Sequence, residues 1–269
     1  MTDHSTGERA LADRIRTDIA HNARVWNHWL GGKDNYPVDR AVGDQVTGMY
    51  PSIGEVARAD RAFLGRVVTH LAGEVGVRQF LDIGTGLPTV DNTHEVAQRI
   101  APDARVVYVD NDPIVLAHAR ALLTSAPGGV TEYIDADAHR PQEIVDGARN
   151  TLDLDRPVAV MMLGILNFVL DTDAARAIVR TVMDAVPSGS HLVLTHPTLE
   201  PALGGEGNVE AMAFWNENAT PPITARTREE FTSFLDGLDL LEPGVVSCSR
   251  WRSEEGQVVA QFGAVGRKP

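Results

Sequence analysis

Two patterns of apolar residues divide the chain. Between residues 10 and 30, apolar side chains recur every three or four positions, which indicates one or two amphipathic helices, and further helices are predicted up to about residue 73. From residue 79 onward, short apolar runs alternate with amphipathic segments. This alternation is typical of a parallel sheet with helices on both faces. We therefore predict an N-terminal helical cap over residues 1–74 and a doubly wound α/β domain over residues 75–269.

The spacing of short apolar runs in the α/β region predicts about seven strands. Five apolar runs are predicted to form its parallel strands: Phe80–Ile83, Val106–Asp110, Val130–Ile134, Pro157–Leu163 and His191–Thr195. The helices predicted among them span Pro113–Leu123, Pro141–Asn150, Asp173–Val186 and residues 227–236. Two last strands, near 239–247 and 257–265, are expected to form an antiparallel hairpin. The segment 197–222 is rich in proline and glycine, and we predict that it is an insertion beside the site.

The turn after the first strand carries the clearest chemical signal. Gly84–Gly86 would let the backbone turn sharply and approach a ligand, and Asp110, which closes the next strand, could bind both ribose hydroxyls. A dinucleotide fingerprint needs a third glycine where this chain has Thr89, and Asp82 would repel a pyrophosphate but attract a cation. The pattern favours S-adenosylmethionine over NAD. A plain tight turn, with Asp110 as a helix cap, is the alternative.

Composition limits the other classes of function. The chain has 269 residues and a net charge of −13, which disfavours a broad nucleic-acid-binding face. Cys248 is the single cysteine, so no internal disulfide can form. The N-terminus lacks the apolar core of a signal peptide, and no apolar run is long enough to span a bilayer. We expect a soluble, cytoplasmic protein with no membrane association and leave its oligomeric state open.

A family resemblance rests on five segments: RVWNHWLGGKDNYPVDR, ADRAFLGR, RQFLDIGTGLPTVDNTHEVAQRIAPDARVVYVDNDPIVLAHARALL, LDLDRPVAV and GAVGRKP. From about Arg24 to Pro269, the chain resembles a bacterial S-adenosylmethionine-dependent methyltransferase family long classed as a domain of unknown function. The resemblance implies a class I, Rossmann-like methyltransferase with a seven-stranded, mostly parallel sheet. It implies cofactor contacts at Asp82, Gly84, Thr85, Gly86, Asp110, Asn111 and Asp137. It implies no particular methyl acceptor.

Three strand ends supply further candidates. Asp137 and the adjoining Ala138 follow the third strand, where the carboxylate could accept a hydrogen bond from the adenine amino group, and Asn111 would flank the adenine. Gly164 ends the fourth strand and would leave space for the methyl donor. A loop carboxylate at Asp137 and a packing glycine at Gly164 are the structural alternatives.

The segment Gly31–Tyr36 combines glycines, polar groups and an aromatic ring. Lys33, Asn35 and Tyr36 would fold over the cofactor, with Tyr36 or Trp29 near the sulfonium, an arrangement that cation–π attraction favours. The alternative is a helix C-cap followed by a turn.

Two residues are candidates for catalysis. His196 closes the fifth strand and is the first candidate for a general base, although a structural role is the alternative. Asn167 stands where the resemblance leads us to expect a histidine, and an amide can orient a nucleophile but cannot take its proton. No cluster of residues has the spacing of a metal site.

We predict in-line methyl transfer to an oxygen or nitrogen nucleophile of a small molecule. The alternatives are a cofactor-binding regulatory or partner protein without transfer, and non-methylating chemistry on the same scaffold.

Overall fold

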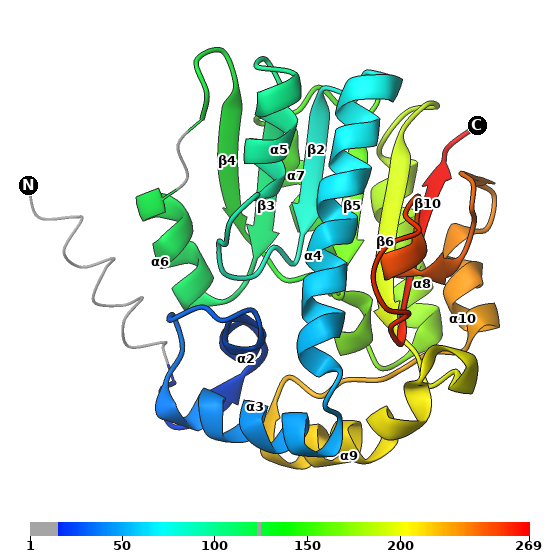
Figure 1. Cartoon of the computed structure of the whole chain (residues 1–269). Helices are drawn as coiled ribbons and strands as arrows, with labels where there is room; N and C mark the ends of the chain where they lie inside the picture. Colours follow the sequence, from blue (N-terminus) through cyan, green and yellow to red (C-terminus); the bar gives the residue numbers. More distant parts are fainter. Residues whose placement is uncertain (1–15, 123–124) are drawn as a thin grey trace, which may run out of the picture.

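The computed structural model describes residues 16–122 and 125–269, and its centre is one mixed sheet with helices on both faces (Figure 1). The strands of this sheet are β2 (Gln79–Ile83), β3 (Arg105–Asp110), β4 (Val130–Asp135), β5 (Ala159–Leu163), β6 (His191–Pro197), β8 (Asp239–Leu240), β9 (Val246–Ser247) and β10 (Gln261–Arg267). Their order is β4-β3-β2-β5-β6-β10-β8, with β9 also beside β10. Strands β2 to β6 run parallel and β10 runs antiparallel to β6. The predicted class I methyltransferase arrangement is confirmed.

The terminal strands differ from the prediction. The stretch expected as one strand near 239–247 forms two short strands, both paired with β10. Between the two strands, Pro243 has no backbone N–H to pair with a neighbouring strand, and Gly244 has a φ of +80°. The chain therefore turns away from the sheet between β8 and β9. The last strand begins at Gln261, because residues 248–250 form a 3-10 helix and the connection to β10 is longer than expected.

Alternate residues of each central strand enter two separate cores. Phe80, Val106 and Met161 belong to the core beneath α4 (Ile53–His70), whereas their neighbours Leu81, Val107 and Met162 belong to the opposite core. This alternation follows from the two-residue period of a strand. The helix α5 (Thr93–Ile100) packs beside α4, and α7 (Pro141–Ala148) packs beside α8 (Thr172–Asp184). Helices α6 (Pro113–Leu122) and α10 (Arg228–Thr232) complete the layers.

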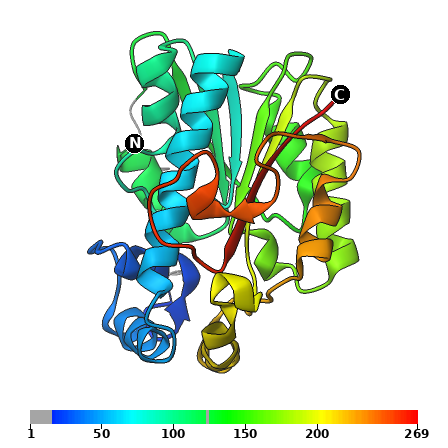
Figure 2. The same cartoon turned by 45° about the vertical axis from the view of Figure 1, so that its right-hand side comes forward.

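The cap and the insertion form a joint layer, which we call the roof. Its parts are β1 (Ala20–His21), α2 (Asn22–Trp29), α3 (Pro37–Met49), α9 (Asn208–Asn218) and β7 (Ala219–Thr220). Figures 1 and 2 show α2, α3 and α9 at the end of the sheet towards which the parallel strands point. β1 pairs with β7, and α3 packs on α9. Helix α4, which falls within the range predicted for the cap, packs on the sheet and also contacts α2 and α3.

A buried ion pair holds the N-terminal half of the roof together. Arg24 Nε lies 2.8 Å from Asp39 Oδ2, and both side chains are almost fully buried. The Asp39 carboxylate also accepts hydrogen bonds from the backbone N–H groups of His21 and Tyr36. One carboxylate therefore joins α2, the start of α3 and β1. Residues 10–15 of the predicted first helix lie outside the described residues.

Candidate active site

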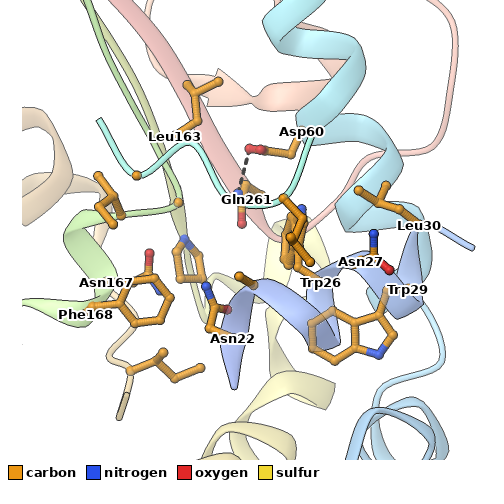
Figure 3. A pocket seen from close by; sticks show the side chains of 18 of the residues that line it. Asn22, Trp26, Asn27, Trp29, Leu30, Asp60, Leu163, Asn167, Phe168 and Gln261 are labelled. Carbon is orange, nitrogen blue, oxygen red and sulfur yellow. Dashed lines mark hydrogen bonds between the residues drawn. The ribbon is translucent and has the colours of Figure 1, made fainter. Parts of the chain in front are cut away.

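A cavity lies between the carboxyl ends of the strands and the roof (Figure 3). Eight of the residues predicted from the sequence line it: Asp82, Gly84, Thr85, Gly86, Asp110, Asn111, Gly164 and Asn167. The roof contributes Asn22, Trp26, Asn27, Trp29, Asn208 and Trp215, and α4 contributes Asp60 and Arg61. The structure therefore brings the two strand-end motifs to one place, in the crevice where open α/β sheets bind their ligands.

The glycine turn has two distinct requirements. Gly84 has a φ of +79°, and a Cβ there would lie 2.5 Å from Ile165 Cδ1, so the turn needs both the left-handed backbone and the missing side chain. Gly86 has a φ of +66°, and nothing lies within 4 Å of its Cβ position. Gly86 lines the cavity, and its Cβ position points into open space. Gly164 also has a positive φ, of +59°, at the end of β5.

The sequence left two roles open for Asp110, ribose binding and helix capping, and the structure separates them between Asp110 and Asp112. The Asp110 carboxylate lines the cavity and accepts hydrogen bonds from the backbone N–H groups of Gly86, Asn111 and Asp112. Burial raises the pKa of Asp110 despite these bonds. Asp112 instead accepts from the backbone N–H of Ile114 in the first turn of α6. The helix-capping role therefore belongs to Asp112, and Asp110 is left facing the cavity.

Asp82 is a second carboxylate of the cavity wall, and its side chain is buried. Thr93 Oγ1 donates to its Oδ2 over 2.6 Å, and burial raises its pKa to about 6. Arg61 opposes this rise through its positive charge. The Arg61 guanidinium donates to the backbone carbonyl of Val90 and to Asn92 Oδ1. Among the described residues that line the cavity, Arg61 is the only arginine or lysine.

Asp60 is a third carboxylate, which no pattern in the sequence singles out because its spacing on α4 is that of an ordinary helical residue. Its side chain is 8% exposed and lines the cavity. Gln261 Nε2 donates to Asp60 Oδ1 over 2.8 Å and lies 3.3 Å from Thr195 Oγ1 (Figure 3). Burial raises the pKa of Asp60, against the hydrogen bonds from Thr195 and Gln261.

Besides His21 Nδ1, which lies 2.8 Å from Asp112 Oδ2, two polar atoms of the lining have no hydrogen-bond partner within the described part of the protein. They are Asn167 Oδ1 and Thr89 Oγ1, and both are buried. Asn167 lies in the 3-10 helix η2 (Leu166–Phe168), just beyond the end of β5. Buried polar groups are normally paired, so these two atoms mark places where a bound molecule would supply the partner.

His196 does not reach the cavity lining. Arg226 Nη1 lies 2.7 Å from its Nε2, and its Nδ1 lies 2.8 Å from the backbone oxygen of Pro197. Since a guanidinium can only donate, Nε2 accepts and Nδ1 carries the proton. Burial lowers the pKa of His196 to about 3. Arg226 in turn donates to the carbonyls of Leu166 and Val169. The geometry gives His196 a part in holding the η2 loop and leaves it no free nitrogen for a nucleophile.

The segment Gly31–Tyr36 and the pair Asp137–Ala138 also lie outside the cavity lining. The Lys33 side chain is exposed, and Asn35 Nδ2 donates to Asn27 Oδ1. The Tyr36 ring lies 5.3 Å from Arg24 Cζ. Asp137 accepts from the backbone N–H of His139. The preceding helix α2 faces the cavity, and the loop at residues 31–36 does not. Helical periodicity alone does not show which of the two lies beside a site.

The described residues contain no group of three or more metal-binding side chains and no helix both long and apolar enough to cross a bilayer.

Comparison with known proteins identifies the family of this chain. A profile of the family described as S-adenosyl methyltransferase matches residues 8–269. A DUF574 family protein from Streptomyces avermitilis is 43% identical, with 94% of this chain and 99% of that one covered and a TM-score of 0.88. A candidate methyltransferase from Thermobifida fusca is 39% identical, with 94% and 97% covered and a TM-score of 0.86.

A more distant structure shares the fold alone. It is magnesium protoporphyrin IX methyltransferase from Synechocystis PCC 6803 with bound SAH (S-adenosylhomocysteine), at 12% identity, 91% and 93% coverage and a TM-score of 0.55. A search of curated proteins found no match. The family profile spans nearly the whole chain, and the two more similar structures cover it almost end to end. The chain therefore belongs to the S-adenosyl methyltransferase family, and its cofactor is S-adenosylmethionine.

Proposed function

We propose that this protein transfers the methyl group of S-adenosylmethionine to an oxygen or nitrogen nucleophile of a small molecule by in-line displacement. The observation that carries the proposal is the charge pattern of the cavity. Asp82 and Asp110 face it beside a single guanidinium, that of Arg61, and the roof supplies mainly apolar and aromatic side chains on the other side. When bound, the cofactor would supply an electrophilic methyl group on a positively charged sulfur.

The polar groups match the parts of that cofactor. Asp110 would accept hydrogen bonds from the ribose hydroxyls, because the glycine turn leaves space in front of it. Asp82, when ionised, would attract the ammonium group, and Arg61 would bind the carboxylate of the amino-acid tail. Thr89 Oγ1 is buried without a partner in the same turn and offers one further polar contact.

We place the adenine beside Asn111, Asp137 and Ala138. Asn111 lines the cavity, and Asp110 is paired in register with Asp135, so Asp137 follows on the adjacent strand end. Asn35 and Tyr36 would act indirectly, since they contact Asn27 and Arg24 of α2. Lys33 has an exposed side chain outside the cavity, and we assign it no role.

The chain's own contribution to the rate is mainly positioning. Effective molarities for well-oriented groups reach about 10⁵–10⁸ M, so a cavity that holds the nucleophile, methyl group and sulfur in line can supply much of the acceleration. The unpartnered Asn167 Oδ1 can hold the hydrogen of an incoming nucleophile at the end of β5. His196 is occupied by Arg226 and cannot serve as the base in this arrangement.

Titration calorimetry with S-adenosylhomocysteine tests the cofactor site. Asp110→Ala removes a charged acceptor, and we expect a loss of affinity of about tenfold or more, since hydrogen bonds to charged groups contribute about 1.5–3 kcal/mol. Asp103→Asn is the control, because Asp103 is an exposed carboxylate that lies 3.5 Å from Arg78. Unchanged binding by a folded Asp110→Ala protein would rule out this site.

A second candidate function is cofactor binding without transfer. It is favoured by the position of His196, which leaves the cavity without the base that was expected there. Saturable binding of S-adenosylhomocysteine, with no methylated product from any acceptor class, would support it. A single stoichiometric methylated product would exclude it.

A further inference from the structure

The roof side of the cavity is lined by indole rings. Two of them direct their polar atoms to the backbone: Trp29 Nε1 donates to the Gly43 carbonyl over 3.2 Å, and Trp215 Nε1 donates to the Pro221 carbonyl over 2.9 Å. The centroids of Trp29 and Trp215 lie 6.3 Å apart, and those of Trp26 and Trp29 lie 5.8 Å apart. These three rings therefore offer the cavity carbon surface that suits a flat, aromatic molecule.

The Asp60 carboxylate lines the same cavity from α4. Figure 3 shows Asp60, Gln261 and Trp26 around the same pocket. The hydrogen-bond donors that hold Asp60 are the neutral side chains of Gln261 and Thr195, and the adjacent Arg61 directs its guanidinium to Val90 and Asn92. No ion pair within 4.0 Å is formed by Asp60 in the described part of the chain. Burial raises the pKa of Asp60 against these two hydrogen bonds, so the Asp60 carboxylate is a stronger proton acceptor than an exposed aspartate.

Asn167 supplies a second, independent sign that a ligand belongs here. Its side chain is 6% exposed, lines the cavity and leaves Oδ1 without a partner among the described residues. The neighbouring Phe168 adds another aromatic ring to the lining. The cavity thus combines an amide and a carboxylate with the apolar side chains of the roof, as in pockets that bind an apolar body and orient it by a few polar contacts.

We propose that the methyl acceptor is an aromatic hydroxy or amino compound that packs against the indoles of the roof and gives its proton to Asp60. This inference rests on the proposed methyl transfer. The acceptor's oxygen or nitrogen lone pair forms the new bond to the methyl carbon, and the carbon–sulfur bond breaks with its electron pair left on sulfur. The acceptor's proton goes to the Asp60 carboxylate and from there to solvent. Asp60 is then a catalytic residue, and Asn167 orients the nucleophile.

Three probes of similar size test the acceptor class: 2-naphthol, naphthalene and decahydro-2-naphthol. Each is titrated into protein already saturated with S-adenosylhomocysteine. We expect 2-naphthol to bind about tenfold more tightly than naphthalene, because it adds a hydrogen bond to a charged acceptor. It should bind several-fold more tightly than decahydro-2-naphthol, because aromatic pairs add attraction beyond the burial of their surface. Equal affinities, or no saturable binding of 2-naphthol, would overturn the proposal.

The same samples separate the two levels of the account. Failure to bind S-adenosylhomocysteine contradicts the proposed function itself. Binding of S-adenosylhomocysteine without preference for 2-naphthol contradicts only the acceptor class. With S-adenosylmethionine in its place, we expect 2-methoxynaphthalene by mass spectrometry, and tight 2-naphthol binding without that product would exclude proton transfer to Asp60.

Asp60→Asn keeps the shape of the side chain and an oxygen for Gln261, and Asp103→Asn makes the same change of charge on the surface. We expect Asp60→Asn to abolish the preference for 2-naphthol over naphthalene and to lower product formation by about 10²–10⁴-fold, the range for loss of a general base. Asp103→Asn should leave the affinity for S-adenosylhomocysteine unchanged, and Asp60→Asn should change it far less than Asp110→Ala, since the Asp60 charge acts on Asp82 but its side chain is assigned no contact with the cofactor. An unchanged 2-naphthol preference in Asp60→Asn would assign Asp60 a purely structural role.

A measurement on the unaltered protein covers the case in which Asp60→Asn misfolds. The preference for 2-naphthol should decrease as pH falls and Asp60 becomes protonated, while naphthalene binding stays constant. The groups that face Asp60 are Gln261 and Thr195, with the charges of Arg61 and Asp82 and the buried thiol of Cys248 nearby. A preference that is independent of pH down to the acid limit of folding would contradict the role of Asp60.

Discussion

At the scale of single residues, the cavity is lined by carboxylates whose ionised form destabilises the folded protein. Asp60, Asp82 and Asp110 are all held in surroundings that raise their pKa by burial. A carboxylate whose folded pKa lies above its unfolded value destabilises the folded state once it is ionised. Such an arrangement persists where binding or catalysis requires it. Asp82 allows the cost to be measured.

Asp82→Asn should stabilise the protein at alkaline pH. The pKa of Asp82 rises from 3.8 to about 6 on folding, so the folded state holds the proton more tightly between these values, and the free energy of unfolding falls as pH rises through this window. Above it, we expect Asp82→Asn to gain about 1–3 kcal/mol. Urea unfolding at several pH values measures the gain, which should vanish near pH 4. A variant less stable than the parent protein at pH 8 would contradict this.

Cofactor affinity should have the opposite dependence on pH. Protonation of Asp82 below about pH 6 removes the charge that would attract the ammonium group. We therefore expect the affinity for S-adenosylhomocysteine to fall by up to about tenfold per pH unit in that range. Asp110 contributes in the same direction, so Asp82→Asn should make the decline shallower without removing it. A flat profile in the parent protein would show that the Asp82 charge plays no part in binding.

His196 shows why a residue's type and its position along a strand were not enough to predict a catalytic base. The sequence places it correctly at the end of β6, but its side chain lies among Phe231 and Phe234, away from the cavity. The direction of the side chain depends on Arg226, which is distant in sequence and satisfies the carbonyls of the η2 loop. Because burial lowers the pKa of His196 to about 3, it should contribute no limb near pH 6.5 to the pH profile of methyl transfer.

At the scale of elements, the regular βα units were predictable and the roof contacts were not. Apolar runs and the glycine motif located β2, β3 and the turn between them, because local spacing determines these elements. The pairing of β1 with β7 joins segments about two hundred residues apart, and two-residue strands leave no periodic signal. The local sequence around β1 and β7 therefore gave no sign that the two segments meet.

The turn between β2 and α5 provides an element-level prediction with its own control. Gly86→Ala should destabilise the protein by about 1–2 kcal/mol, the cost of a left-handed backbone in a residue with a Cβ. Gly84→Ala should cost about 1–3 kcal/mol more, because its Cβ would also lie 2.5 Å from Ile165 Cδ1. Chemical denaturation compares the two, and Gly84→Ala/Ile165→Ala should recover part of the difference. Equal losses in both single variants would contradict the close approach of Ile165 to the turn.

At the scale of the whole molecule, the cavity joins parts that fold as different layers. The sheet provides the cofactor side, α4 provides Asp60 and Arg61, and the roof provides the apolar side. The glycine turn and Asp110 could be located because they lie in one continuous stretch of sequence. Arg61, Asp60, Trp215 and Gln261 could not, because they meet that stretch only in the folded chain.

Binding should therefore rigidify α2 and α9 together. Both helices line the cavity, and the β1–β7 pairing connects them. Hydrogen exchange followed by mass spectrometry should show slower exchange in residues 22–29 and 208–218 when S-adenosylhomocysteine is bound. Helices α7 and α8, which pack on the face of the sheet opposite α4, serve as the internal control. Protection confined to only one of the two roof helices would contradict their action as a unit.

The most direct test of the central claim is a crystal structure of the protein with S-adenosylhomocysteine. The account predicts ribose hydroxyls within hydrogen-bond distance of Asp110, the amino-acid tail between Asp82 and Arg61, and the sulfur facing Gly164 and the indoles of the roof. A ligand bound elsewhere, or one bound in this cavity with its ribose away from Asp110, would contradict the account.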